Sequence, residues 1–136
     1  MAGELAAISI LKSDSVIQGF CGVNPTRVYP FQVPQGKSLP AITVRSTSTE
    51  PNGTKDGPSQ LDFERLQVII WTDEFNTTTY ELEQRVRELL DRPTPGAVNG
   101  VNLESSSFED RDTFKEQLVD KEVFAIEHIY KTIIKR

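Results

Sequence analysis

The sequence is poor in the residues that build covalent, metal and catalytic sites. Its 136 residues include one cysteine, Cys21, and one histidine, His128. A single cysteine excludes a disulfide within the chain, and one histidine beside it leaves little material for a zinc site. No orienting motif supports a nucleophile and base made from the two. We therefore expect no catalysis, no cofactor and no metal, and we interpret Cys21 as a buried thiol and His128 as a strand histidine with hydrogen-bond partners.

Two kinds of segment are also missing. No Gly-x-Gly-x-x-Gly or Walker-type loop occurs, so nothing favours nucleotide binding. No apolar run approaches the roughly 20 residues that a membrane-spanning helix requires, so we expect no membrane contact. The N-terminus, Met1 to Leu5, has neither the basic residues nor the long apolar stretch of a secretory signal. We expect the chain to stay in the cytoplasm where it is made.

The charge is acidic and localised. A net charge of −5 argues against a protein that grips DNA, since phosphate neutralisation needs clustered Lys and Arg. Between Glu104 and Glu127, eight acidic residues stand against three basic ones. We predict an exposed loop from Ser105 to Glu116, and we interpret its acidic cluster as solvated, since Arg111 interrupts it and the Gly and terminal Glu of a calcium loop are absent. Four acidic residues of this loop are candidates to face a lumen or a partner: Glu109, Asp110, Asp112 and Glu116.

The length and the apolar pattern predict one α+β domain over residues 1–136. The sheet is expected to be mainly antiparallel, with four to five strands, one long helix packed on it and a short N-terminal helical segment. Helical spacing covers Glu4 to Gln18, with a break at Ser13 and Asp14, which can cap a new turn. The predicted strands are Ala41 to Thr49, Leu61 to Thr72, Val101 to Ser105 and Glu122 to Ile134.

Two of these strands carry further information. In the second, the apolar positions change from odd to even numbers, which predicts a bulge near Glu64 and Arg65. We expect its aromatic residues, Phe63 and Trp71, to pack in the core under the helix. The last strand is apolar on both faces, so it is central in the sheet or covered by another subunit.

The long helix is predicted over Thr78 to Asp91. Thr78 and Glu81 have the spacing of a capping box, and Pro93 ends the pattern. The apolar positions Leu82, Val86 and Leu90 should be buried, whereas the charges on the helix should be exposed: Glu81, Arg85, Arg87 and Glu88.

Before the second strand lies a segment dense in turn residues. Pro51-Asn52-Gly53 and Asp56-Gly57-Pro58-Ser59 predict an exposed loop from Glu50 to Ser59. No apolar residue anchors it, so we interpret it as a candidate assembly interface. Its candidate contact residues are Glu50, Asn52, Gly53, Lys55, Asp56 and Ser59.

The succession of these blocks resembles a known family. Arg27 to Pro30 is followed by Leu39 to Val44, then by Asp56 to Ser59, then by the apolar strand ending at Trp71 and its helix. This order and spacing resemble the small tail-completion, or tail-terminator, proteins of long-tailed bacteriophages. The resemblance runs from about Arg27 to Leu90, with a looser similarity in the final strand.

The resemblance implies a structural virion protein assembled in the host cytoplasm. Such a protein forms a homo-oligomeric ring, commonly a hexamer, at the head-proximal end of the tail. There it ends polymerisation of the tail tube protein and joins the tail to the head connector, while DNA passes through without specific binding. The alternatives are a head-tail connector or neck protein, a small hydrolase-like or ligand-binding α+β domain, and an adaptor that binds peptides at a sheet edge.

Overall fold

The computed structural model describes residues 2–23, 25–34, 36–54, 57–93, 95–98, 100–117 and 122–135. The helices are α1 (Ala2–Ser13), α2 (Ser15–Cys21) and α3 (Thr77–Leu90). The strands are β1 (Val28–Pro30), β2 (Ala41–Thr54), β3 (Gly57–Thr72), β4 (Gly96–Val98), β5 (Val101–Gln117) and β6 (Glu122–Lys135). The α+β class is confirmed.

The sheet is larger than predicted. Six strands pair in the order β1-β2-β3-β6-β5-β4, and β1 runs parallel to β2 while the other pairs are antiparallel. The short extended piece expected at Arg27 to Tyr29 is present as the edge strand β1, but its parallel pairing and the other three-residue edge strand, β4, were not predicted. Strands this short show no apolar alternation, so the sequence gives little sign of them.

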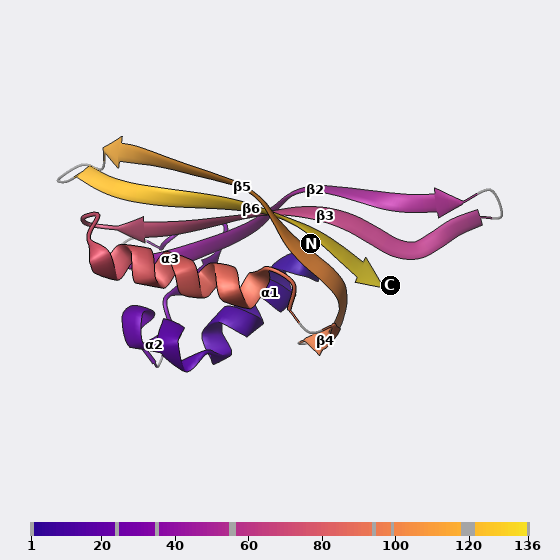
Figure 1. Ribbon diagram of the computed structural model, residues 1–136, viewed down its shortest axis with the longest axis horizontal. Helices are drawn as coiled ribbons and strands as arrows, with labels where there is room; N and C mark the ends of the chain where they lie inside the picture. The colour runs from indigo at the N-terminus through magenta and orange to yellow at the C-terminus, as the bar shows by residue number, and fades with distance from the viewer. Residues whose placement is uncertain are drawn as a thin grey trace.

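The three helices lie on one face of the sheet (Figure 1). Even-numbered residues of β3 and β6, such as Val68, Ile70 and Ile126, form the core beneath them. On α3, Leu82, Val86 and Leu90 are buried against this face, as the helical spacing predicts. The last strand, β6, lies between β3 and β5, so its two apolar faces belong to a central strand.

The caps of the helices join distant segments. Asp14 caps α2 by accepting the N–H groups of Val16 and Ile17, so the predicted break in the N-terminal helix is confirmed. The same carboxylate forms a two-bonded ion pair with Arg85 of α3, at 2.5 and 3.0 Å. Arg85 was predicted to be an ordinary exposed charge, and this was wrong because a residue 71 positions away is its partner.

The N-cap of α3 also differs from the prediction. Asn76 accepts the N–H of Thr79 at 3.1 Å, and the Thr79 hydroxyl accepts the N–H of Asn76. This reciprocal pair replaces the predicted box of Thr78 and Glu81, because an asparagine caps a helix as well as a threonine does. The helix therefore begins and ends one residue earlier than the predicted Thr78 to Asp91.

No register shift occurs in the pairing of β3 with β6, so the predicted bulge near Glu64 and Arg65 was wrong. The shift lies on β2, between Ser46 and Ser48. Glu64 continues the core-facing positions of β3 and is only 2% exposed. Its carboxylate accepts the N–H of Gly3 at 3.1 Å, in the first turn of α1, where the helix dipole favours an anion.

The aromatic residues of β3 lie on the face away from the helices, which corrects the expectation that Phe63 and Trp71 pack under α3. Trp71 pairs in register with Ala125, which pairs in turn with Phe114. The Trp71 and Phe114 rings meet edge to face, 5.8 Å apart between centroids. The odd-numbered positions take this face because β3 keeps one phase throughout, with Val68 and Ile70 against the helices.

Candidate assembly surfaces

The predicted loop from Glu50 to Ser59 is a β-hairpin, so the loop prediction was wrong. β2 continues to Thr54 and β3 begins at Gly57, with Thr54 opposite Gly57. The backbones of Glu50, Asn52, Gly53 and Ser59 therefore lie in strands, whereas Lys55 and Asp56 lie outside the described residues. A register shift between Pro51 and Gly53 explains how turn-forming residues are tolerated in a strand.

This hairpin extends beyond the rest of the sheet as an arm (Figure 1). The pairing of β3 with β6 begins at Leu61, opposite Lys135, so in the described part of the chain residues 57–60 pair only with β2. We call residues 50–60, apart from the undescribed residues 55 and 56, the β2–β3 arm. An isolated two-stranded hairpin is marginally stable at best, so an arm of this kind is suited to being held by a neighbour.

The second predicted loop, Ser105 to Glu116, is also a strand. β5 runs from Val101 to Gln117 and pairs with β6 over nearly its whole length. Its distal half is mostly polar, with Phe108 and Phe114 as its apolar residues, so the alternation that identifies a strand is missing from the sequence. The β5–β6 hairpin projects from one end of the sheet, and the β2–β3 arm projects from the other end (Figure 1).

The four acidic candidates of β5 are spread along this strand rather than gathered into one site. Glu109 forms an ion pair with Arg65 at 3.2 Å. The carboxylates of Asp110 and Asp112 each accept the N–H of the next residue at 2.8 Å. Glu116 is exposed. Among the described residues, no three acidic, histidine or cysteine side chains are grouped to hold a metal ion.

On the same face as Trp71, polar side chains cross three strands. The Nε of Arg45 on β2 donates to Oε1 of Gln67 on β3 at 2.6 Å. Nε2 of Gln67 donates in turn to Oε2 of Glu127 on β6 at 2.5 Å. Asp112 lies opposite Glu127 in the pairing of β5 with β6, so the acidic character of β5 continues onto this face.

A buried polar network joins α3 to the sheet. His128 is 1% exposed, and both of its ring nitrogens have partners. Nε2 lies 2.7 Å from the carboxylate of Glu83, and Nδ1 lies 2.8 Å from the hydroxyl of Tyr130. Arg111 of β5 pairs with the same Glu83 carboxylate. The neutral tautomer that satisfies all the groups donates from Nε2 to Glu83 and accepts the Tyr130 proton at Nδ1.

The electrostatics of this network oppose acid-base chemistry. Burial lowers the pKa of His128 more than Glu83 raises it, so the imidazole is neutral. Burial raises the pKa of Glu83, but hydrogen bonds from Arg111 and His128 outweigh it and the net shift is downward. Burial also raises the pKa of the Tyr130 hydroxyl, so it keeps its proton. The interpretation of His128 as a strand histidine with hydrogen-bond partners is confirmed.

Cys21 is separate from this network. The thiol is buried in the core, and burial raises its pKa to about 11. Neither ring nitrogen of His128 is bonded to it. The interpretation of Cys21 as a buried thiol is confirmed. The pairing of Glu83 with Arg111 could not be predicted from the sequence, because it depends on how α3 lies across β5.

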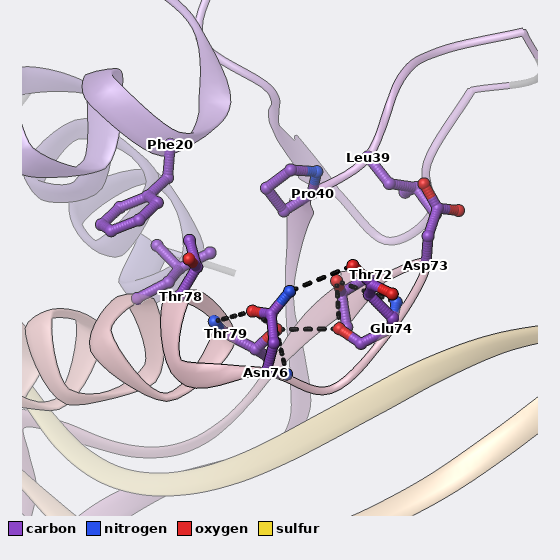
Figure 2. Close-up of a pocket in the computed structure, with 10 residues that line it drawn as sticks. Phe20, Leu39, Pro40, Thr72, Asp73, Glu74, Asn76, Thr78 and Thr79 are labelled. Atoms are coloured by element: carbon purple, nitrogen blue, oxygen red, sulfur yellow. Dashed lines mark hydrogen bonds between the residues drawn. The ribbon is translucent and has the colours of Figure 1, made fainter.

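One pocket opens where α2 and α3 meet the end of β3 (Figure 2). Its volume is about 220 Å³. Its apolar walls come from three segments of the chain and consist of Phe20, Leu39, Pro40 and Leu82. Exposed carboxylates at its rim belong to Asp73 and Glu74, and Asn76, Thr78 and Thr79 complete the polar side. Nothing in its lining pairs a nucleophile with a base.

These features define a class of protein: a small α+β protein whose sheet carries a projecting hairpin at each end. Within the described residues, no helix is both long and apolar enough to cross a membrane. The chain matches the family described as tail completion protein gp17 over residues 6–128, and it belongs to that family. The resemblance in the sequence is confirmed, and the protein is a structural component of a phage-like virion tail.

A solved structure supports the fold. A chain from the virion of a native gene transfer agent particle superimposes with a TM-score of 0.68 at 19% sequence identity. The alignment covers 99% of this protein and 97% of that chain. No curated protein matches the sequence.

Proposed function

We propose that the protein forms a ring, of six subunits, at the head-proximal end of a phage-like tail. There it ends polymerisation of the tail tube protein and offers a surface to the head connector, and residues 1–136 act in this as one tail-completion domain. The observation that carries the proposal is the pair of hairpins at opposite ends of the sheet (Figure 1). A ring needs two different surfaces on each subunit, because its interfaces are heterologous and close only through rotation.

The two hairpins take different roles in this proposal. The β2–β3 arm contacts a neighbouring subunit or the adjoining ring through Glu50, Asn52, Gly53, Lys55, Asp56 and Ser59. The acidic residues of β5, namely Glu109, Asp110, Asp112 and Glu116, face the lumen or a partner. In a lumen, their negative charge repels DNA, so that DNA passes without binding.

Deleting the gene from a producing strain distinguishes a protein that ends polymerisation of the tail tube from one that only joins the tail to the head. Tubes much longer than those of the wild type, seen by electron microscopy, are expected, because nothing caps the growing end. Tails of normal length without heads would identify a neck protein instead. Normal particles in the absence of the protein would contradict both functions, and re-supplying the wild-type gene is the control.

A further inference from the structure

An exposed aromatic side chain follows β1 in a strained turn. Phe31 is 67% exposed and has a φ of 71°. The N–H of Gln32 donates to the carbonyl of Pro30 at 2.8 Å, so the three residues have the hydrogen bond and the φ of a rare, strained γ-turn. A bulky residue is an outlier at positive φ, and glycine would hold the same turn without strain. Strain retained in this way points to a functional side chain.

The orientation of this side chain is fixed before any partner binds. The Phe31 N–H donates to the carbonyl of Val44 at 3.0 Å. The guanidinium of Arg45 lies over the ring, 5.4 Å from its centroid, and is itself held by Gln67. A preorganised aromatic residue loses little freedom on binding, which is the property of an interface anchor. Phe31 thus presents a phenyl ring and a cation together.

The pocket of Figure 2 has the complementary chemistry. The pocket has a volume of about 220 Å³, and Phe20, Leu39, Pro40 and Leu82 form its apolar side. A closed apolar cavity of about 150 Å³ accommodates benzene, so a phenyl ring has room here. The carboxylates of Asp73 and Glu74 at the rim would meet the guanidinium that accompanies the ring.

The two features lie on opposite faces of the sheet. Arg45 belongs with Gln67 and Glu127 on the face away from the helices, whereas the pocket is walled by α2 and α3. We propose that Phe31 of one subunit enters this pocket of the next subunit, with Arg45 against Asp73 and Glu74. The inference rests on the ring of the proposed function, and it names the contact that joins its subunits head to tail.

The first test replaces Phe31 with glycine. The Phe31→Gly variant should unfold at the same denaturant concentration as the wild type or higher, because the turn loses its strain. It should nonetheless fail to form rings on assembled tails. Tyr80→Ala is the matched control, since Tyr80 is also exposed, at 52%, and lies outside the pocket lining; its rings should persist. Normal rings from Phe31→Gly would overturn the proposal.

The second test detects the contact directly in tails that assemble normally. In a Cys21→Ser background that keeps Phe31, the pair Gln32→Cys and Thr78→Cys should form disulfides between subunits in assembled tails, because the exposed Gln32 follows Phe31 directly and Thr78 lines the pocket. These disulfides should give a ladder of linked copies that reduction collapses. The control pair, Gln32→Cys with Lys12→Cys, should give none. Rings without the ladder would overturn this contact and leave the proposed function intact. The absence of any ring in wild-type tails would refute the proposed function, and this contact would fall with it.

Discussion

Two ionisable side chains, Glu64 and His128, occupy core-facing positions of neighbouring strands, and each is bonded to a helix. Glu64 accepts the N–H of Gly3 on α1, and His128 is bonded to Glu83 on α3. Buried polar groups cost free energy unless they are hydrogen-bonded, so each bond is lost at a penalty if its helix moves. These residues therefore fix where the helical layer lies on the sheet.

The buried histidine makes stability depend on pH. The pKa of His128 is lowered from its ordinary 6.5 because burial disfavours the charged imidazole, and Arg111 and Arg87 add repulsion against the attraction of Glu83. Below about pH 6.5 the unfolded chain binds a proton that the folded chain does not, so stability present above that pH is lost as the pH falls. Urea unfolding at pH 7.5 and 5.5 should show this loss.

His128→Gln is the control for this pH dependence. The variant should be less stable than the wild type at pH 7.5, yet lose little further stability at pH 5.5, because the chain contains no other histidine. The lowered pKa of Glu83 affects the stability only at more acidic pH, below the ordinary glutamate pKa of 4.5. Equal stability of the wild type at the two pH values would contradict the assignment of a buried neutral imidazole.

Val86 tests the packing of α3 at a single residue. Val86 is 0% exposed, so Val86→Asp should leave an uncompensated charge in the core and reduce the free energy of unfolding by about 4 kcal/mol or more. Gln84→Asp, on the exposed side of the same helix, should change it by less than about 1 kcal/mol. Chemical denaturation of the two variants measures the difference. A similar loss of unfolding free energy in both variants would mean that the buried face of α3 is assigned wrongly.

At the scale of elements, the β2–β3 arm is expected to be needed for assembly and not for folding. Replacing Glu50 to Ser59 with Asn52-Gly53 alone should leave the melting temperature close to that of the wild type. Residues 57–60 pair only with β2 in the described part of the chain, and shortening a connection changes closure entropy little. Attachment of heads to tails should be blocked, as counted by electron microscopy. Normal attachment with the shortened arm would mean that it has no role in assembly.

The elements that the sequence predicts well are those with a one-sided apolar pattern. Leu82, Val86 and Leu90 locate α3 to within one residue, because burial on one helix face imposes the spacing. The distal halves of β2 and β5 were predicted as loops, since their backbones are paired while their sequences are polar or rich in turn residues. Each distal half pairs with the strand that follows it directly in the chain, so its backbone is satisfied although its side chains show no apolar alternation.

The candidate site was predictable only in outline. Of the segments proposed for assembly, Glu50 to Ser59 and the distal end of Ser105 to Glu116 lie in the hairpins at the two ends of the sheet (Figure 1). The Asp14–Arg85 pair, the Glu83 network and the pocket each join segments distant in sequence. Such contacts depend on how the helices lie on the sheet, and no spacing rule within one segment reveals them.

At the scale of the whole molecule, the protein is a helical layer on a sheet whose hairpins extend at both ends (Figure 1). The face of the sheet without helices carries aromatic side chains, among them Trp71 and Phe114. It also carries the polar row of Arg45, Gln67 and Glu127. A subunit of this design has different chemistry on its two faces. Head-to-tail contacts, which a closed ring requires, join such unlike faces.

The central claim is that this tail completion protein closes the head-proximal end of the tail as a ring. Cryo-electron microscopy of assembled particles, with subunits located by the fold described here, measures this most directly. The account predicts one ring of six copies between the last tube ring and the head connector, with the β2–β3 arm of each copy against a neighbouring subunit or the adjoining ring. Copies distributed along the tube, or single copies without mutual contact, would contradict it.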